Sequence, residues 1–92
     1  MRVVLIHEDN HGMIGVALNY FQAVNWLINE QWLADNTEVY DSKTESWNRL
    51  DEELGEGWAD LLMDYWDIDN FNAYFSGSFY LESVEVYNSG MG

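Results

Sequence analysis

Residues 2–18 decide the fold, and their sequence is RVVLIHEDNHGMIGVAL. Residues 2–7 form an apolar run rich in β-branched side chains, which favours a strand. Residues 8–12 have turn chemistry, and an apolar course resumes over residues 13–18 around Gly15. We therefore predict a β-hairpin over residues 2–18.

A helix is predicted directly after the hairpin. Asn19 is a suitable N-cap, and Gln22 stands three residues later, in the position of a capping-box partner. Apolar residues then recur at helical spacing, which predicts a buried stripe of Phe21, Val24, Leu27, Ile28 and Trp32. We expect this helix to end at Asp35 and Asn36, since Asn tolerates a left-handed C-terminal position.

Shorter helices are predicted in the middle of the chain, after a short extended segment at residues 37–40. Ser42 and Glu45 form a capping box for a helix over residues 43–54, with Gly55 as its stop. The side chains expected on one side of this helix are Trp47, Leu50 and Leu54. A further helix begins near Trp58, and its expected buried residues are Trp58, Leu61, Leu62 and Tyr65.

A last helix and a strand complete the predicted fold. Asp67 caps this helix, Trp66 staples to Phe71, Phe75 continues the apolar face and Gly77 ends it. Residues 78–87 alternate as a strand that has to bury Val84 and Val86, and the N-terminal hairpin is the simplest partner. We predict an α+β fold: a three-stranded antiparallel sheet with three to four helices inserted between strands 2 and 3. The whole chain, residues 1–92, is expected to form one domain, with residues 88–92 as a frayed tail.

The charge of the chain is strongly one-sided. Seventeen acidic residues against three basic ones give a formal net charge of −14, while 48% of the residues are hydrophobic and 16% aromatic. Disordered acidic chains are poor in both classes, so the composition predicts a folded protein. The basic side chains are Arg2, Lys43 and Arg49, which nearly excludes binding to nucleic acid or to an anionic membrane.

Cysteine is absent, which rules out disulfides and thiolate metal sites and favours an intracellular setting. The longest apolar run, residues 3–6, is far too short to cross a membrane, and no signal-peptide pattern is present. We therefore expect a cytoplasmic protein, whether it belongs to a cell or to something that replicates inside one.

Two motifs resemble metal sites but lack the required context. His7 and His11 match H-E-x-x-H, yet the zinc-protease motif needs both His on one helix turn, and this match follows a strand-like run. Asp64, Asp67 and Asp69 fit no EF-hand register, since Gly at the sixth position and Glu at the twelfth are missing. No nucleophile motif or phosphate-binding loop is found either, so we expect no metal, no cofactor and no enzymatic activity.

The acidic residues are concentrated between residues 51 and 69, in the sequence DEELGEGWADLLMDYWDID. We predict a partner-binding surface formed by Asp51, Glu52, Glu53, Glu56, Asp60, Asp64, Asp67 and Asp69, with Trp66 as an aromatic anchor. On a continuous helix, every fourth residue of this row would lie about 5–6 Å apart. Successive phosphates of one nucleic-acid strand lie at a similar spacing, roughly 6–7 Å. Gly55 and Gly57 are expected to break the helix and bend the row.

The acidic block, the further acids Glu30, Asp35, Glu38, Asp41 and Glu45, and the opening VVLIHEDNHGMIGVA together resemble small acidic bacteriophage proteins that disarm host nucleic-acid enzymes. These families include anti-CRISPR proteins, antirestriction DNA mimics and uracil-DNA glycosylase inhibitors. The resemblance covers size, charge and folded character and has no diagnostic motif. It implies a basic nucleic-acid-binding partner, and the favoured target is a type II CRISPR nuclease, whose Arg side chains and positive channel suit carboxylates. If a bacteriophage encodes the chain, the resemblance also implies that the protein acts in the cytoplasm of the host bacterium.

Three hypotheses stay open at this point. An inhibitor that mimics nucleic acid, directed at a CRISPR, restriction or DNA-repair enzyme, predicts salt-sensitive binding that competes with nucleic acid. An acidic halophilic or structural domain predicts unfolding at low salt and no such partner. A metal-dependent enzyme predicts stoichiometric zinc at His7 and His11, and a folding midpoint that moves on chelation. The hypotheses are ranked in that order.

Overall fold

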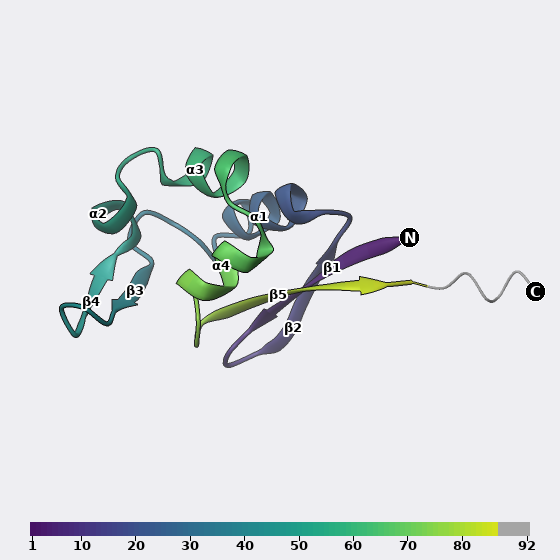
Figure 1. Cartoon of the computed structure of the whole chain (residues 1–92), viewed down its shortest axis with the longest axis horizontal. Helices are drawn as coiled ribbons and strands as arrows, with labels where there is room; N and C mark the ends of the chain where they lie inside the picture. The colour runs from purple at the N-terminus through teal and green to yellow at the C-terminus, as the bar shows by residue number, and fades with distance from the viewer. Residues whose placement is uncertain (87–92) are drawn as a thin grey trace, which may run out of the picture.

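A three-stranded antiparallel sheet organises the fold in the computed structural model, which describes residues 1–86 (Figure 1). Strand β1 (Arg2–Glu8) lies in the middle, with β2 (Gly12–Ala17) on one side and β5 (Phe79–Glu85) on the other. Both pairings are antiparallel. The α+β class and the predicted sheet are thus confirmed, while the expected tail at residues 88–92 lies outside the described residues.

The register of β1 against β5 decides which face of the sheet is buried. Ile6 pairs with Leu81, and both are fully or almost fully buried. Val84 pairs with Val3 on the opposite face, because successive side chains of a strand point to opposite sides. The expectation that Val84 and Val86 are buried is therefore wrong: Val84 is half-buried and Val86 is exposed.

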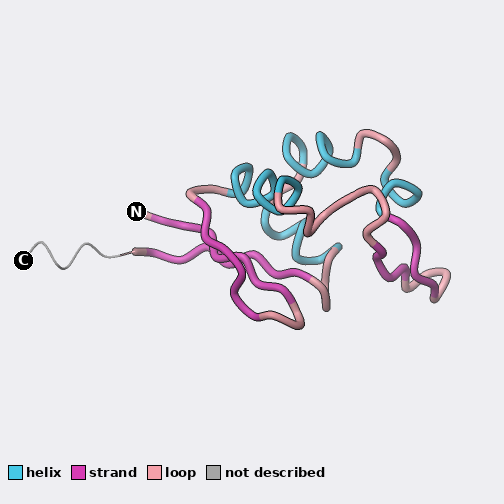
Figure 2. Tube along the Cα trace, turned by 180° about the vertical axis from the view of Figure 1, so that it is seen from behind, coloured by secondary structure: helices cyan, strands magenta, loops and turns pink. Residues whose placement is uncertain are grey.

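Four helices are inserted between β2 and β5: α1 (Tyr20–Asn29), α2 (Leu50–Leu54), α3 (Trp58–Tyr65) and α4 (Ile68–Tyr74). Helices α1 and α4 contact the sheet, and α3 packs on α1 (Figures 1 and 2). Their shared core includes the fully buried side chains of Ile6, Leu27, Leu50, Leu62 and Phe71. Among residues 1–86, no helix is long and apolar enough to cross a bilayer.

Close packing of α1 on the sheet depends on a glycine in β2. A Cβ atom placed on Gly15 would lie 3.1 Å from the ring of Trp26. That separation is shorter than ordinary van der Waals contact, so the missing side chain is what lets Trp26 rest on the strand. The absence of a side chain at Gly15 therefore allows α1 to pack closely against β2.

The predicted helix caps at Asn19 and Asp67 are confirmed. The Asn19 side chain accepts a hydrogen bond from the backbone N–H of Gln22 at 2.8 Å, and Asp67 accepts one from Asn70 at 2.9 Å. Each bond satisfies a backbone donor that the first helical turn leaves free, which stabilises a helix by about 1 kcal/mol. Gly55, with φ of 88°, ends α2 as expected.

Helix α1 ends at Asn29, six residues before the expected end at Asp35. Gln31 adopts a left-handed backbone with φ of 62°, and the N–H of Trp32 returns to the carbonyl of Leu27 at 2.8 Å. This Schellman-type ending turns the chain back so that Leu33 enters the core. The predicted stripe is also wrong at Phe21, which is half-exposed, whereas Val24 and Leu27 are buried.

The predicted helix over residues 43–54 is the largest error. Residues 43–45 lie in a turn, residues 46–49 form strand β4 (Ser46–Arg49), and only Leu50–Leu54 is helical. Strand β4 pairs with β3 (Glu38–Asp41), which confirms the extended segment predicted at residues 37–40. Asp41 accepts a hydrogen bond from the backbone N–H of Lys43 at 2.9 Å, and Glu45 takes a left-handed φ of 53°. These two features form the turn that the capping-box interpretation of Ser42 and Glu45 missed.

Candidate protein-binding surface

The predicted acidic surface is spread over three helices and the segments between them. Residues 50–86 contain no Lys or Arg at all. The first turn of α2 holds Asp51, Glu52 and Glu53, and Glu56 lies between α2 and α3. Asp60 and Asp64 lie on α3, Asp67 caps α4, and Asp69 is in its first turn. The acidic residues are thus distributed over α2, α3 and α4 and the segments that join them, whose course is shown in Figure 1.

The carboxylates do not form one regular helical row. Gly55 leaves the helical conformation and Gly57 is the N-cap of α3, so the break expected at these glycines is confirmed. Of the residues at four-residue spacing, Asp60 and Asp64 share one helix. Cβ atoms at that spacing on a helix lie about 5–6 Å apart. The acidic surface is therefore bent rather than straight.

Half of the predicted carboxylates are committed to the fold itself. Arg49 holds Asp51 with two hydrogen bonds, of 3.1 and 2.9 Å, in a bidentate pair. Glu53 accepts from the Asn48 amide at 3.0 Å, and Glu52 accepts from the Arg49 backbone at 3.4 Å. With the cap at Asp67, these four side chains hold local structure and are less free to bind a partner.

The other four carboxylates are free within the part of the chain that the structure describes. They take part in none of its ion pairs or side-chain hydrogen bonds and are all exposed: Glu56, Asp60, Asp64 and Asp69. Residues 50–86 supply no Lys or Arg, and Arg2 and Arg49 are paired with Glu85 and Asp51. These four residues are the strongest candidates for contact with a cationic partner.

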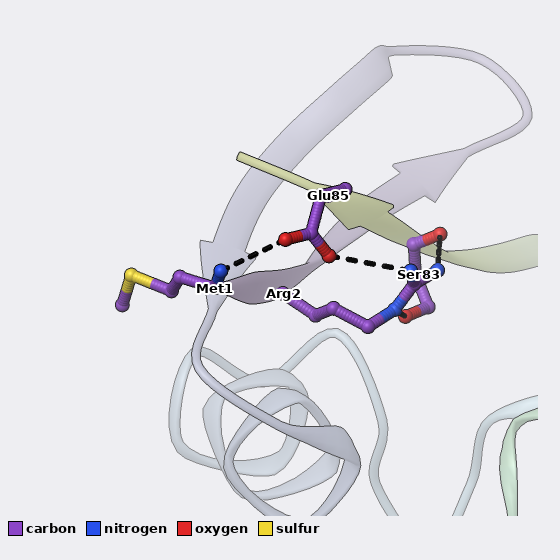
Figure 3. Close-up of polar contacts among 4 residues, drawn as sticks. All are labelled: Met1, Arg2, Ser83 and Glu85. Carbon is purple, nitrogen blue, oxygen red and sulfur yellow. Dashed lines mark hydrogen bonds and ion pairs between the residues drawn. The ribbon is translucent and has the colours of Figure 1, made fainter. Parts of the chain in front are cut away.

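Arg2 is engaged at the far end of the sheet (Figure 3). Its guanidinium donates to the Ser83 carbonyl at 3.1 Å and to the Ser83 hydroxyl at 3.0 Å, and lies 3.5 Å from the Glu85 carboxylate. The amino group of Met1 is 2.9 Å from the same carboxylate. Exposed ion pairs of this kind add little stability, but the Glu85 carboxylate compensates the charge of Arg2.

The aromatic side chains that are most exposed are not those the sequence indicated. Trp66 is half-buried and packs edge-on against Tyr74, with ring centroids 5.1 Å apart. Tyr65, expected in the core, is 79% exposed, and Trp47, also expected inside, is 59% exposed. Trp47 pairs across the β3–β4 hairpin with Tyr40, at a centroid distance of 5.5 Å. The sequence predicts the extended segment that forms β3, but it assigns residues 46–49, which form β4 and carry Trp47, to a helix.

A hollow of about 220 Å³ lies between the β3–β4 hairpin and the C-terminal end of α4. Its walls include the exposed rings of Tyr40 and Trp47, together with Tyr74 and Phe75. The hydroxyl of Tyr74 is buried and has no hydrogen-bond partner among residues 1–86. Burial raises the pKa of Tyr74 to about 12, and the negative charges of Glu53 and Asp41 contribute. The walls of the hollow are therefore mainly aromatic.

The H-E-x-x-H match does not have the geometry of a metalloprotease. His7 lies in β1 and His11 in the following turn, so they do not share a helix turn. His7 is 3.2 Å from Glu82, while His11 is 2.6 Å from Glu8. The bond from His11 lowers the pKa of Glu8. Each imidazole thus has its own carboxylate, and residues 1–86 hold no group of three or more His, Asp or Glu side chains placed to bind one metal ion.

Comparison with known proteins adds no relative: no family model, no curated protein and no solved structure matches this chain. Function is therefore inferred from the charges, the exposed aromatic rings and the shape of this molecule.

Proposed function

We propose that this protein is a phage-type anti-CRISPR inhibitor that binds a type II CRISPR effector nuclease and presents its acidic helical surface to the nuclease's basic DNA- and PAM-binding groove. The observation that carries the proposal is a set of four exposed carboxylates that have no ion-pair partner among residues 1–86, within a stretch that has no Lys or Arg: Glu56, Asp60, Asp64 and Asp69. Ordinary solvated surfaces mix charges of both signs, so such a surface is suited to a cationic partner.

The target class follows from the chemistry that nucleic-acid enzymes use. A type II effector reads its PAM with Arg side chains and holds the guide–target duplex in a positive channel. Carboxylates make short, charge-assisted hydrogen bonds with guanidinium groups, as phosphates do. A bent acidic surface that carries several such groups competes for the same Arg and Lys side chains, and the resulting association weakens as salt rises.

A competition assay tests the proposal. A guide-loaded type II nuclease and a labelled target duplex are mixed with the protein at low and at raised salt, and both DNA binding and cleavage are measured. We expect the protein to displace the duplex, and we expect the displacement to weaken with salt. The double variant Asp60→Asn/Asp64→Asn should inhibit at least tenfold less well, since each lost charge-assisted contact is worth about 1.5–3 kcal/mol.

The matched control removes the same charge elsewhere. Asp9 lies in the β1–β2 turn and Glu30 at the end of α1, and both are exposed. The variant Asp9→Asn/Glu30→Gln has the same net charge as the test variant and should inhibit like the unmodified protein. Equal loss in both variants would show a general charge effect and contradict a defined surface.

The remaining outcomes separate the alternatives. If the duplex stays bound while cleavage stops, the protein inhibits the nuclease by another route and the mimicry proposal is wrong. If neither changes, the CRISPR assignment fails, and restriction and DNA-repair enzymes are tested in the same format. Unfolding of the protein at low salt, followed by circular dichroism, would instead support an acidic halophilic domain.

A further inference from the structure

The three-stranded sheet has a second face, which the helices of the described chain leave uncovered (Figures 1 and 2). Residues that lie directly opposite each other on antiparallel strands share a face of the sheet. Leu5 of β1 is opposite Val16 of β2 and Glu82 of β5. Leu5 also stands between the buried residues Val4 and Ile6, so this row points away from the core. We call this side the outer face, and its apolar side chains are Val3, Leu5, Met13, Val16, Tyr80 and Val84.

The outer face is apolar and open to solvent. Met13, Val16 and Tyr80 are each more than half exposed. None of the six apolar side chains belongs to the buried core or packs against it within residues 1–86. Helix α1 packs on the opposite face, where the Trp26 ring lies against Gly15. Contiguous apolar surface of this kind on a soluble protein marks a site of interaction.

The outer face is nearly free of charge, although the chain as a whole has a net charge of −14. Its acidic and basic side chains are Glu82 and His7, whose Oε1 and Nε2 atoms lie 3.2 Å apart. Glu82 belongs to the edge strand β5, at the rim of the face, and stays partly exposed there. The face therefore has little to attract a basic partner, which is drawn to the acidic helices instead.

We propose that the outer face binds the same face of a second copy of this chain, so that two sheets pack face to face about a two-fold axis. Sheets packed in this way lie about 10 Å apart, and their apolar side chains interdigitate. A two-fold contact brings a surface against its own copy. A neutral apolar face meets that condition, whereas the acidic helices would meet their own charge.

This arrangement also keeps the acidic surfaces of the two copies apart. The helices lie on the inner side of each sheet, so they become the two outermost layers of the dimer (Figure 2). With sheets about 10 Å apart and helices about 10 Å across, the two helical layers are separated by about 30 Å. Charges repel each other over a screening length of about 8 Å at physiological salt. The outer face is thus a surface through which two strongly acidic chains can associate without strong repulsion.

Sedimentation velocity of the whole protein tests the dimer. The face measures roughly 14 by 24 Å, from the spacing of three strands and the rise of seven residues. That is small for a specific interface, so we expect a dissociation constant in the micromolar range. The sedimenting species should change from one chain to two as the protein concentration is raised from below micromolar to near millimolar. A protein that stays monomeric over the whole range would overturn the proposal.

Salt gives a second readout, with the opposite sign to that expected for the acidic surface. Dimerisation should strengthen several-fold as salt rises, because salt screens the repulsion between two chains of charge −14 and leaves the apolar contact in place. Binding of the acidic helices to a basic nuclease should weaken under the same change. A dimer that dissociates as salt rises is held by charge and would contradict an apolar interface.

A charge placed on the outer face locates the contact. Val16→Glu brings a carboxylate into the centre of the apolar interface and should weaken dimerisation at least tenfold, because the charge would lose its water on association. Val16 is exposed in the single chain, so the variant is expected to fold, and circular dichroism checks this. Tyr65→Glu makes the same change in net charge at an exposed position of α3 and should dimerise like the unmodified protein. Equal dimerisation of the two variants would show that the outer face is not the interface.

NMR on a mixture of isotope-labelled and unlabelled chains tests the geometry without any substitution. Contacts between copies should come from the side-chain methyl groups of Leu5, Val16 and Val84. Contacts confined to the backbone of β2 would indicate edge-to-edge pairing of strands and overturn the face-to-face arrangement. The inference does not depend on the nuclease: a monomeric protein that inhibits leaves the anti-CRISPR proposal standing, and a dimer without inhibition leaves this one standing.

Discussion

Asn72 of α4 closes the outer edge of β5 by binding both backbone groups of Leu81. Its amide Nδ2 donates to the Leu81 carbonyl at 2.9 Å, and its Oδ1 accepts from the Leu81 N–H at 2.7 Å. An edge strand with free backbone groups is a template for pairing with other chains. One side chain therefore fastens α4 to the sheet and protects the strand at the same time.

Asn72→Ala should destabilise the protein by about 2–3 kcal/mol, because it removes two hydrogen bonds and leaves two partly buried backbone groups without their partners. The free energy of unfolding, measured in urea, checks this value. Asn70→Ala is the matched control on the same helix, since no side-chain hydrogen bond of Asn70 is found among residues 1–86. Equal losses in the two variants would contradict the role of Asn72.

Gln31→Gly should stabilise the protein by up to about 1 kcal/mol. Gln31 holds a left-handed φ of 62° at the end of α1, a conformation that glycine adopts without steric cost. A gain of this size raises the midpoint of thermal unfolding by about 4–8 °C in a domain of this length. Gln31→Ala keeps the steric cost and should show no rise. A lower midpoint for the glycine variant would refute the argument.

Tyr74→Phe should leave stability unchanged or slightly increased at neutral pH, because the hydroxyl that it removes is buried and has no partner in the described chain. The pKa of Tyr74 is raised from its ordinary value of 10 to about 12, so the folded state favours the neutral phenol. This contribution is fully present below pH 10 and is lost as the pH rises toward 12.

Stability measured between pH 9 and 12 should therefore fall less steeply in Tyr74→Phe than in the unmodified protein. Tyr20 provides the comparison: its hydroxyl donates to the Leu62 carbonyl at 2.7 Å, and burial also raises its pKa. Tyr20→Phe should lose about 1 kcal/mol already at pH 7, since it removes a satisfied hydrogen bond. Identical pH profiles for Tyr74→Phe and the unmodified protein would count against the prediction.

In Glu8→Gln, the free energy of unfolding should fall less steeply at acidic pH than in the unmodified protein. The hydrogen bond from His11 lowers the pKa of Glu8, and the backbone N–H groups of Asn10 and His11 also donate to this carboxylate. A lowered pKa in the folded state means that the contribution is present above the ordinary value of 4.5 and is lost as the pH falls below it.

The difference in unfolding free energy between the unmodified protein and Glu8→Gln, measured from pH 7 to pH 3, isolates this effect from the other acids. It should be largest near neutral pH and shrink below pH 4.5. Asp9→Asn, next in the chain and exposed, should show no such trend. A difference that stays constant over the whole range would contradict the role of Glu8.

Local signals made much of the fold predictable. Several features depend only on residues that are close in sequence, so the sequence predicts them. They are the apolar runs of the first hairpin and the last strand, the caps at Asn19 and Asp67, and the end of α2 at Gly55. The density of acids near residues 51–69 is likewise a property of composition alone. The chain by itself therefore determined the α+β class, the sheet partners and the sign of the surface charge.

Only the tertiary structure decided the features that depend on distant contacts. Helix α1 stops at Asn29 because Leu33 is needed in the core, and residues 38–49 form a hairpin whose ladder sets Trp47 beside Tyr40. Local propensity gives a Trp the same weight whether it ends buried or exposed, since its ring is both apolar and able to meet water. The tertiary structure also decides which carboxylates have hydrogen-bond partners. Asp51 is bound by Arg49 and Glu53 by Asn48, because folding brings these side chains together.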